Sequence, residues 1–254
     1  MNLDYPKRIA VKILRRLPSR VFRTRDPLHC FHSYEYLRHN ARRLEHLASL
    51  RIPVRGMTVL DVSSGMGDHS HYYVDRHCAV TLTDVRPENL RCLRTRYPGH
   101  EVQFLDMERP GPINGSPFEI VHCYGLLYHL AHPEQALAFL SAQCTRTMFL
   151  ETSVSFGDAK EVNLVTEDRA DLSQAFSGTG CRPTRRWVFE KLQKLFEYVY
   201  LPTTQPNHEE FPLDWSAPEK HLAPLKRAVF ICSRSAMDSP LLTRSLISLQ
   251  TRHE

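Results

Sequence analysis

The chain has 254 residues, of which 42% are hydrophobic and 24% charged, and its formal net charge is +5. These proportions are typical of a folded globular protein and exclude a disordered chain, a collagen-like fibre and a coiled coil. No apolar run reaches the roughly 18 to 20 residues that a membrane span needs, so we expect no transmembrane segment.

Cysteine usage and charge distribution narrow the class of protein further. The seven cysteines are scattered and form no CxxC pair, which favours reduced thiols in a cytoplasmic protein over a disulfide framework or a zinc ribbon. Residues 1–28 contain eight Lys or Arg but only two acidic residues, so they carry +6 and leave −1 for the remainder. We therefore expect a nearly neutral body preceded by a basic segment.

The first predicted element is a basic helix. Residues 5–17 place apolar side chains at helical spacing with Lys and Arg on the other side, and Pro18 ends the pattern. Such a helix can lie on a membrane surface, bind RNA or pack on its own domain, and the pattern does not choose among the three. We treat residues 1–33 as an N-terminal arm.

Helices and strands alternate from residue 34 to residue 151. This alternation indicates a parallel sheet with right-handed crossovers, which places the chain in the α/β class. The predicted helices cover 34–50 and 68–76 and follow Pro87 and Pro133. The predicted strands are the short apolar runs at 57–62, 79–84, 102–106, 118–123 and 147–151.

The regular rhythm ends after residue 151. Residues 153–183 are polar and too long for an ordinary connection, so we interpret them as a lid or substrate segment. The proline-rich stretch 202–224 is expected to wrap the surface, and the tail 235–254 is expected to be poorly ordered. A helix at 184–196 and strands at 198–201 and 228–232 complete the domain, which we place at 34–234.

The most specific motif is a glycine loop after the first predicted strand. Residues 59–68 read VLDVSSGMGD, at the carboxyl end of a strand, where an open α/β sheet binds its ligand. Gly65 and Gly67 let the backbone approach a ligand closely. The dinucleotide fingerprint GxGxxG fails, because Ser70 occupies its third glycine position.

The next three strand ends also carry candidate binding residues. Asp84 ends the second strand 19 residues after Gly65, close to the spacing at which a strand-end carboxylate reaches the hydroxyls of a ribose. Asp106 and Met107 end the third strand, and the fourth strand runs into HCYGLLYH at 122–129. Four elements in this order are more specific than any one of them.

With these elements in this order, the chain resembles the class I S-adenosylmethionine-dependent methyltransferases. The resemblance covers about residues 34–152 and extends more loosely to the last helix and strands. It implies a Rossmann-like, doubly wound sheet of seven mostly parallel strands with an antiparallel last strand, together with N-terminal helices and a lid insertion. It also implies S-adenosyl-L-methionine as the cofactor.

The resemblance assigns residues to the cofactor as well. It implies that Asp84 holds the ribose, that Asp106 accepts a hydrogen bond from the adenine amine, and that Met107 covers the adenine ring. Ser63 stands where the family has the first glycine of its loop. Taken singly, the acids could also cap turns or end strands in solvent. The implied cofactor-binding residues are Asp61, Ser63, Gly65, Gly67, Asp84, Asp106, Met107 and Tyr124.

Methyl transfer from a sulfonium is an in-line displacement, and it needs a base only where the acceptor must lose a proton. His129 is the candidate base, because it matches a position near the acceptor in small-molecule members of the family and titrates in a suitable range. A capping or core histidine beside Pro133 is the alternative reading. Tyr124 and Tyr128 are candidate catalytic residues that orient the acceptor, or else buried packing residues.

Other clusters are less specific. The His and Cys residues that are close in sequence lack a second pair at ligand spacing, so we expect no metal site. Arg38 and Arg42 could reach the carboxylate of the cofactor, whereas Arg43 is expected to face water. Three arginines near the last long helix could bind a carboxylate or phosphate, although a solvated helix start is the commoner explanation; these are Arg182, Arg185 and Arg186.

The preferred function is methyl transfer to an O, N or C atom of a small molecule, under a lid made from 1–33, 153–183 and 202–224. The stretch 125–129 followed by Pro133 is also similar to the tRNA wobble-uridine carboxymethyltransferase subgroup. The alternative is therefore a tRNA-modifying enzyme whose basic first 28 residues contact phosphates. A third function is a catalytically silent binding protein with the same fold.

Overall fold

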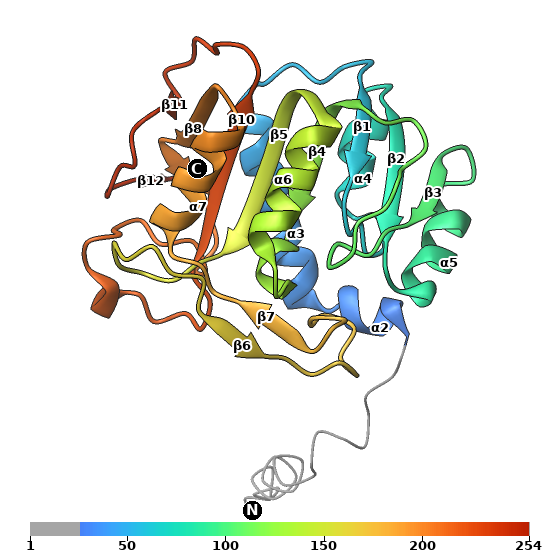
Figure 1. The fold of residues 1–254 in the computed structure, drawn as a ribbon, viewed down its shortest axis with the longest axis horizontal. Helices are drawn as coiled ribbons and strands as arrows, with labels where there is room; N and C mark the ends of the chain where they lie inside the picture. The colour runs from blue at the N-terminus through green and yellow to red at the C-terminus, as the bar shows by residue number, and fades with distance from the viewer. Residues whose placement is uncertain (1–25, 254) are drawn as a thin grey trace, which may run out of the picture.

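A mostly parallel sheet forms the centre of the protein, with helices on both of its faces (Figure 1). The computed structural model describes residues 26–253, so the helix predicted at 5–17 lies outside the described residues. The strands of the main sheet are β1 (Thr58–Asp61), β2 (Ala79–Asp84), β3 (Glu101–Phe104), β4 (Phe118–Tyr124), β5 (Cys144–Ser153), β8 (Tyr198–Pro202), β10 (Arg227–Ser233) and β11 (Leu242–Thr243).

Strand order and direction confirm the predicted fold class. The order across the sheet is β11-β8-β10-β5-β4-β1-β2-β3. The pairs formed among β1 to β5 are parallel, whereas β10 runs antiparallel to both β5 and β8. The seven predicted strands are therefore present with an antiparallel last strand, and the two-residue β11 adds an eighth at the edge.

All the α-helices between residues 26 and 253 except α4 begin at a side-chain cap or a proline. The hydroxyl of Ser33 accepts the N–H of Tyr36 at the start of α3, and the hydroxyl of Thr184 accepts the N–H of Trp187 at the start of α7. Pro87 and Pro133 are the first residues of α5 and α6. The helices are α2 (Pro27–Phe31), α3 (Tyr34–Ser49), α4 (Ser70–Val74), α5 (Pro87–Arg96), α6 (Pro133–Gln143) and α7 (Arg185–Leu195).

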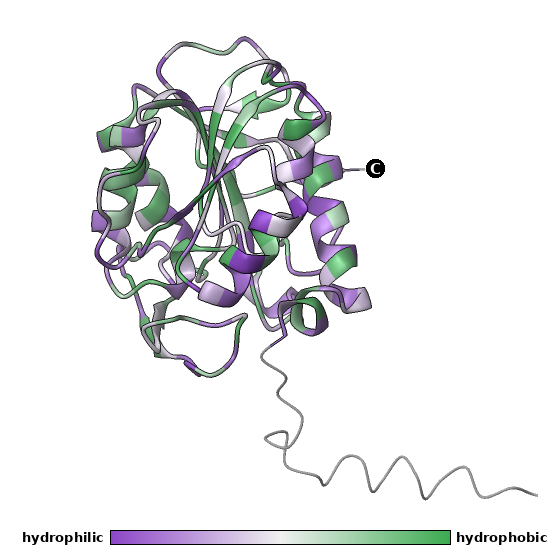
Figure 2. Cartoon of the chain, turned by 90° about the vertical axis from the view of Figure 1, so that its right-hand side faces the viewer, coloured by the Kyte–Doolittle hydropathy of each residue, from purple (hydrophilic) through white to green (hydrophobic). Residues whose placement is uncertain are grey.

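Alternating strand residues supply two hydrophobic layers, one on each face of the sheet. Successive side chains of a strand point to opposite faces, so Val59 packs in a cluster with Leu47 of α3, while Leu60 packs in a cluster with Leu137 of α6. In Figure 1, α6 and α7 lie in front of the sheet and α3 lies behind it, and the view turned by 90° in Figure 2 shows helices on both sides of the strands. Because both faces are covered, a ligand reaches this sheet at the ends of its strands.

Residues 153–183 contain a small hairpin that the sequence pattern did not predict. The strand β6 (Leu164–Thr166) pairs antiparallel with β7 (Thr179–Cys181), and β7 packs beside the 3-10 turn η1 (Leu127–His129). Figure 1 shows β6 and β7 below the main sheet, at the end toward which the arrow of β5 points. The hairpin therefore lies over the carboxyl ends of the parallel strands.

The expectation of a poorly ordered tail is wrong for residues 235–253. β12 (Thr251–Arg252) pairs with β9 (Thr204–Gln205), and Arg252 donates to the backbone carbonyls of Pro206, His208 and Phe211. The side chain of Gln250 accepts from Trp215 at 2.8 Å. This order comes from hydrogen bonds to the proline-rich stretch and from partly buried apolar residues, such as Leu241, Leu242 and Ile247, that pack against the core. Hydropathy did not reveal it, because the strands formed there are only two residues long.

Within residues 26–253, no helix combines the length and the apolar character needed to cross a membrane.

Candidate active site

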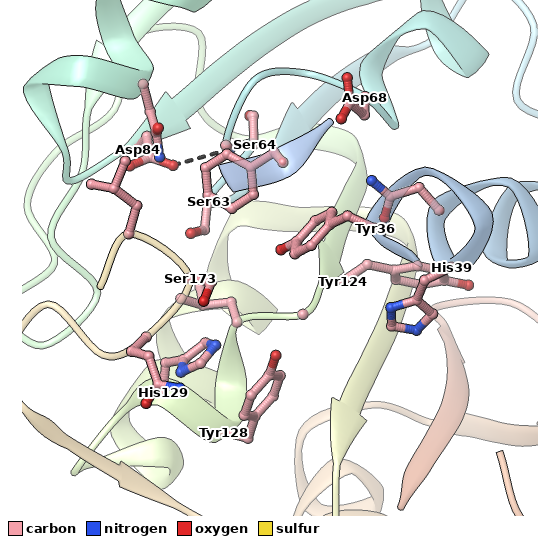
Figure 3. A pocket seen from close by; sticks show the side chains of 18 of the residues that line it. Tyr36, His39, Ser63, Ser64, Asp68, Asp84, Tyr124, Tyr128, His129 and Ser173 are labelled. Atoms are coloured by element: carbon pink, nitrogen blue, oxygen red, sulfur yellow. Dashed lines mark hydrogen bonds between the residues drawn. The ribbon is translucent and has the colours of Figure 1, made fainter. Parts of the chain in front are cut away.

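A cavity of about 590 Å³ opens at the carboxyl ends of β1, β2 and β4 (Figure 3). Its volume lies within the range of about 300 to 1,000 Å³ that is usual for small-molecule sites. One side is formed by the glycine loop and the ends of β2 and β3, and the other by α3, η1 and residues of the turn 208–210. Residues 172–177, from the connection between β6 and β7, close it from outside.

The sequence-predicted site residues meet in this cavity with one exception. Gly67 does not line it; a side chain there would collide with the ring of Tyr97, and the backbone has φ of +79°. Gly67 therefore serves close packing against the end of α5. The predicted residues that do line the cavity are Asp61, Ser63, Gly65, Asp84, Asp106, Met107, Tyr124, Tyr128 and His129.

The glycine loop is tied to the end of β2 by Asp84. The N–H of Gly65 donates to Oδ2 of Asp84 at 3.0 Å, drawn as a dashed line in Figure 3, and the N–H of Arg86 donates to Oδ1 at 2.8 Å. Burial raises the pKa of Asp84, and these hydrogen bonds oppose that shift by favouring the carboxylate. The acid is thus held in one orientation at the edge of the cavity.

Ser63 stands at the first position of the glycine loop. Ser63 adopts a left-handed backbone with φ of 57°, a conformation that glycine adopts without steric cost. Asp61, just before it, is buried, and burial raises the pKa of this carboxyl to about 7. The hydroxyl of Ser70 donates to Asp61 and so joins the loop to the start of α4.

His129 is paired with a glutamate from the segment 153–183. Oε2 of Glu167 lies 2.5 Å from Nδ1 of His129, and its other oxygen accepts from Arg182 at 3.0 Å. Burial lowers the pKa of His129, although the adjacent carboxylate opposes the shift. Burial alone would raise the pKa of Glu167, but hydrogen bonds from His129, Ala175 and Arg182 outweigh it and lower the pKa. A neutral His129 therefore keeps its proton on Nδ1 and presents a lone pair on Nε2.

A buried network of ion pairs forms the wall near Tyr128. Arg43 donates to Glu151 at 2.7 Å, and Arg227 donates to Glu151 at 3.2 Å and to Glu210 at 2.6 Å. A second guanidinium nitrogen of Arg227 donates to the hydroxyl of Tyr128 at 3.1 Å. The expectation that Arg43 faces water is wrong, because Arg43 lies on the buried side of α3 and pairs with Glu151 of β5.

A chain of neutral groups runs behind Tyr124. The hydroxyl of Tyr73 lies 2.9 Å from Nδ1 of His122, and Nε2 of His122 lies 3.2 Å from Nδ1 of His69. Burial lowers the pKa of His122 to about 3 and also lowers that of His69. Because the Tyr73 hydroxyl has no other described acceptor, it donates to His122, which donates in turn to His69. His69 thereby carries its proton on Nε2.

Several buried polar atoms of residues on the cavity wall have no hydrogen-bond partner among the described residues, so they are available to a ligand. Five of the nine such side-chain atoms found within residues 26–253 belong to residues that line the cavity. Gly65 also faces open space, with no atom within 4 Å of where a side chain would begin. The five atoms are Nε2 of His39, Nε of Arg43, Nε2 of His69, Oδ1 of Asn89 and the Tyr124 hydroxyl.

Sequence reasoning missed the residues that reach the cavity from distant parts of the chain. Glu167 lies in a segment without periodicity, and Glu151, the acidic last residue of the strand predicted at 147–151, was the only available signal for the network. Of the six arginines that the sequence analysis names, Arg43 and Arg182 line the cavity. The others do not line it: Arg38 pairs with Glu209 at its rim, Arg42 with Glu45, Arg185 with the backbone of Ile247, and Arg186 with Asp158.

Residues 59–147 match a protein family described as "Methyltransferase domain". This range begins in β1 and ends in β5, so it covers the glycine loop, the ends of β2 and β3, and η1. No curated protein sequence matches the chain at a significant level.

Solved structures with the same fold include several methyltransferases. The N-terminal domain of EvdMO1, crystallised in the presence of S-adenosylhomocysteine and D-fucose, superposes with a TM-score of 0.59 at 18% identity, over 76% of this chain and 82% of its own. An S-adenosylmethionine-dependent methyltransferase from Mesorhizobium loti gives 0.53 at 14% identity, over 75% and 98%. A putative one from Listeria monocytogenes gives 0.54 at 13% identity, over 77% and 99%. At these identities the shared property is the fold.

Proposed function

We propose that this chain, a class I S-adenosylmethionine-dependent methyltransferase, transfers the methyl group to a hydroxyl or another proton-bearing atom of a small neutral molecule. The proposal is carried by one observation: a single cavity joins the glycine loop and the ends of β2 and β3 to the pair formed by His129 and Glu167. The cofactor supplies a methyl carbon made electrophilic by the sulfonium to which it is attached.

The cofactor is assigned to the side of the cavity formed by the glycine loop. Asp84, fixed by two backbone N–H groups, still has lone pairs for ribose hydroxyls. Met107 is buried at the end of β3 beside Asp106, where an adenine ring would be covered on one face. The unpartnered nitrogen of His69 and the hydroxyl of Tyr124 supply donors near the glycine loop.

The proton-removing group is assigned to His129. Glu167 holds the Nδ1–H of this imidazole, so the Nε2 lone pair is the one available inside the cavity. The carboxylate also stabilises the imidazolium that forms when His129 takes a proton, as in other His–carboxylate pairs. Proton removal matters for hydroxyl acceptors because their neutral form is a weak nucleophile.

The charge pattern at the acceptor end favours a neutral acceptor. Arg227 is already bound by Glu151, Glu210 and the Tyr128 hydroxyl, and Arg43 is bound by Glu151. An anionic acceptor would have to break one of these buried pairs, which is costly. Neutral hydroxyl groups can instead form hydrogen bonds with the carboxylate lone pairs and the arginine N–H groups of this network while its ion pairs stay intact.

The cofactor assignment is tested by calorimetry with S-adenosylhomocysteine. We expect Asp84→Ala to weaken binding by about tenfold or more, since hydrogen bonds to a charged group contribute roughly 1.5–3 kcal/mol. Asp75→Ala is the matched control, because Asp75 is exposed after α4 and does not line the cavity. A folded wild-type chain that binds neither S-adenosylmethionine nor S-adenosylhomocysteine would refute the proposal.

The acceptor class is tested by transfer of a radiolabelled methyl group to a panel of small molecules. The panel pairs neutral hydroxyl compounds with their carboxylated or phosphorylated counterparts. We expect label in the neutral members, and His129→Gln should lose transfer while retaining affinity for S-adenosylhomocysteine. Labelling confined to the anionic members would overturn the assignment of a neutral acceptor.

A further inference from the structure

Two histidines and a glutamate from distant parts of the chain meet at the acceptor end of the cavity. His39 lies on α3, and His208 and Glu210 lie in the turn that follows β9. One ring nitrogen of each histidine and one carboxylate oxygen of Glu210 lie within 4.8 Å of one another. Between residues 26 and 253, no other group of three or more His, Cys, Asp or Glu side chains has this spacing.

The nitrogen Nε2 of His39 is buried without a hydrogen-bond partner among the described residues. The whole residue is only 8% exposed, and Nε2 lies 3.8 Å from Oε2 of Glu210. The two imidazole rings lie face to face with centroids 4.5 Å apart. Leaving such an atom unpaired is costly, so its place on the cavity wall, beside Tyr124 in Figure 3, indicates a ligand.

Neighbouring side chains hold this group in place. Arg227 donates to Oε2 of Glu210 at 2.6 Å, and no described hydrogen bond reaches the other carboxylate oxygen. Arg252 donates to the carbonyl of His208 at 2.8 Å and fixes the turn. Nδ1 of His208 accepts the backbone N–H of Glu210 at 3.3 Å, which orients the ring, and a carboxylate oxygen of Glu209 lies 3.8 Å from its Nε2.

The donor set selects among cations. Two imidazoles and one carboxylate on one side leave coordination positions open to water or substrate, and such sites suit first-row transition ions and zinc. Magnesium and calcium require several oxygen ligands, whereas here Arg43 and Arg227 offset the charges of Glu151 and Glu210. The site therefore offers imidazole affinity without an excess of negative charge.

We propose that His39, His208 and Glu210 bind a divalent ion of the Zn²⁺ or Co²⁺ type in the acceptor end of the cavity. Its open positions face the space assigned to the acceptor, where they can take an oxygen atom. The expectation of no metal considered only residues that are close in sequence, and these ligands come from α3 and from the turn after β9. The site does not depend on the proposed methyl transfer, since cofactor binding and His129 require no metal.

The test uses Co²⁺ alone as a spectroscopic probe of the full-length chain after treatment with a chelator. We expect one Co²⁺ per chain with visible ligand-field bands, displaced by Zn²⁺ and unaffected by excess Mg²⁺. His39→Ala and His208→Ala should each weaken Co²⁺ binding by at least about tenfold. His71→Ala is the matched control, because His71 is an exposed histidine on α4 outside the cavity.

The outcomes separate the proposed site from the alternatives. Wild-type chain that gives no Co²⁺ bands, or bands that persist unchanged in His39→Ala and His208→Ala, would overturn the proposal. If the alanine variants do not fold by circular dichroism, X-ray absorption at the cobalt edge of the wild-type complex decides: two imidazole ligands are expected, and none or one refutes the site. Binding of S-adenosylhomocysteine is measured separately, so failure of the proposed function remains distinguishable.

Discussion

His129 is subject to opposing influences on its pKa. Burial lowers the pKa, the hydrogen bond and charge of Glu167 raise it, and the guanidinium groups of Arg227 and Arg182 lower it again. The net shift is downward from the ordinary value of about 6.5. A general base acts in its deprotonated form, so this shift extends the active range toward lower pH.

We therefore predict a pH profile for kcat/KM that is flat at neutral pH and falls only as pH drops through the lowered pKa of His129. His129→Gln should remove this acid limb and reduce the rate by about 10²–10⁴-fold. Glu167→Gln removes the charge that raises the pKa, so its smaller loss of rate should come with an acid limb at still lower pH. The measurement is kcat/KM against pH for the three proteins.

The two variants distinguish a catalytic role of His129 and Glu167 from a structural one. If Glu167 only held the lid in place, Glu167→Gln would change the rate without moving the acid limb. An acid limb that persists in His129→Gln would mean that another group takes the proton, and His129 would then be a structural histidine beside α6.

The site residues differ in how far sequence could identify them. Asp84 and Met107 were predictable because the end of a parallel strand is where such a sheet binds ligands, and the strands themselves were predictable from apolar runs. Glu167 and Arg227 were not, because their meeting with His129 and Tyr128 depends on how the hairpin and β10 fold back. The periodicity of hydrophobic residues in the sequence does not predict contacts of this kind.

Among the elements, the connection between β6 and β7 is the one that closes the cavity. Arg86, at the start of α5, donates to the backbone carbonyls of Asp171 and Gln174 at 3.0 and 2.9 Å. The same guanidinium lies 5.5 Å from the ring of Phe176. Arg86, which is buried two residues after Asp84, thus links the connection between β6 and β7 to the side of the cavity that Asp84 lines.

Replacement of this arginine should loosen the lid without unfolding the domain. For Arg86→Ala we expect amide hydrogen exchange in residues 168–178 to accelerate by ~10-fold or more, because two hydrogen bonds from a charged donor are lost. Affinity for S-adenosylhomocysteine should fall as well. The matched control is Arg91→Ala, an exposed position on α5 away from the cavity. Unchanged exchange in Arg86→Ala would show that other contacts hold the lid.

The order and type of the elements followed from periodicity up to residue 153, where every strand except β3 is largely buried and every α-helix except α4 begins at a side-chain cap or a proline. β2, for example, was predicted at 79–84 and is observed at Ala79–Asp84. The strands that were missed, such as β6, β9 and β12, are two or three residues long. Elements that short bury too little apolar surface to leave a hydropathy pattern, and partners elsewhere in the chain determine them.

For the whole molecule, the distribution of charge bears on the choice between a small acceptor and tRNA. The eight Lys and Arg residues of the first 28 positions lie within residues 1–25. The described fold begins with Asp26, whose carboxylate accepts the N–H of Leu28 and caps α2. The basic segment can therefore be removed without cutting into a described element.

We predict that deleting residues 1–25 leaves the affinity for S-adenosylhomocysteine and the transfer to a neutral small acceptor unchanged. The remaining chain has a formal net charge of −2, so it lacks the excess of positive charge that would hold a polynucleotide. Radiolabel transfer is measured for the full and shortened chains with the small-molecule panel and with unmodified tRNA, at two salt concentrations. The choice would be reversed if the full chain labelled tRNA and this labelling weakened steeply with salt and was lost on deletion. Phosphate contacts by the basic segment would then supply the affinity for the substrate.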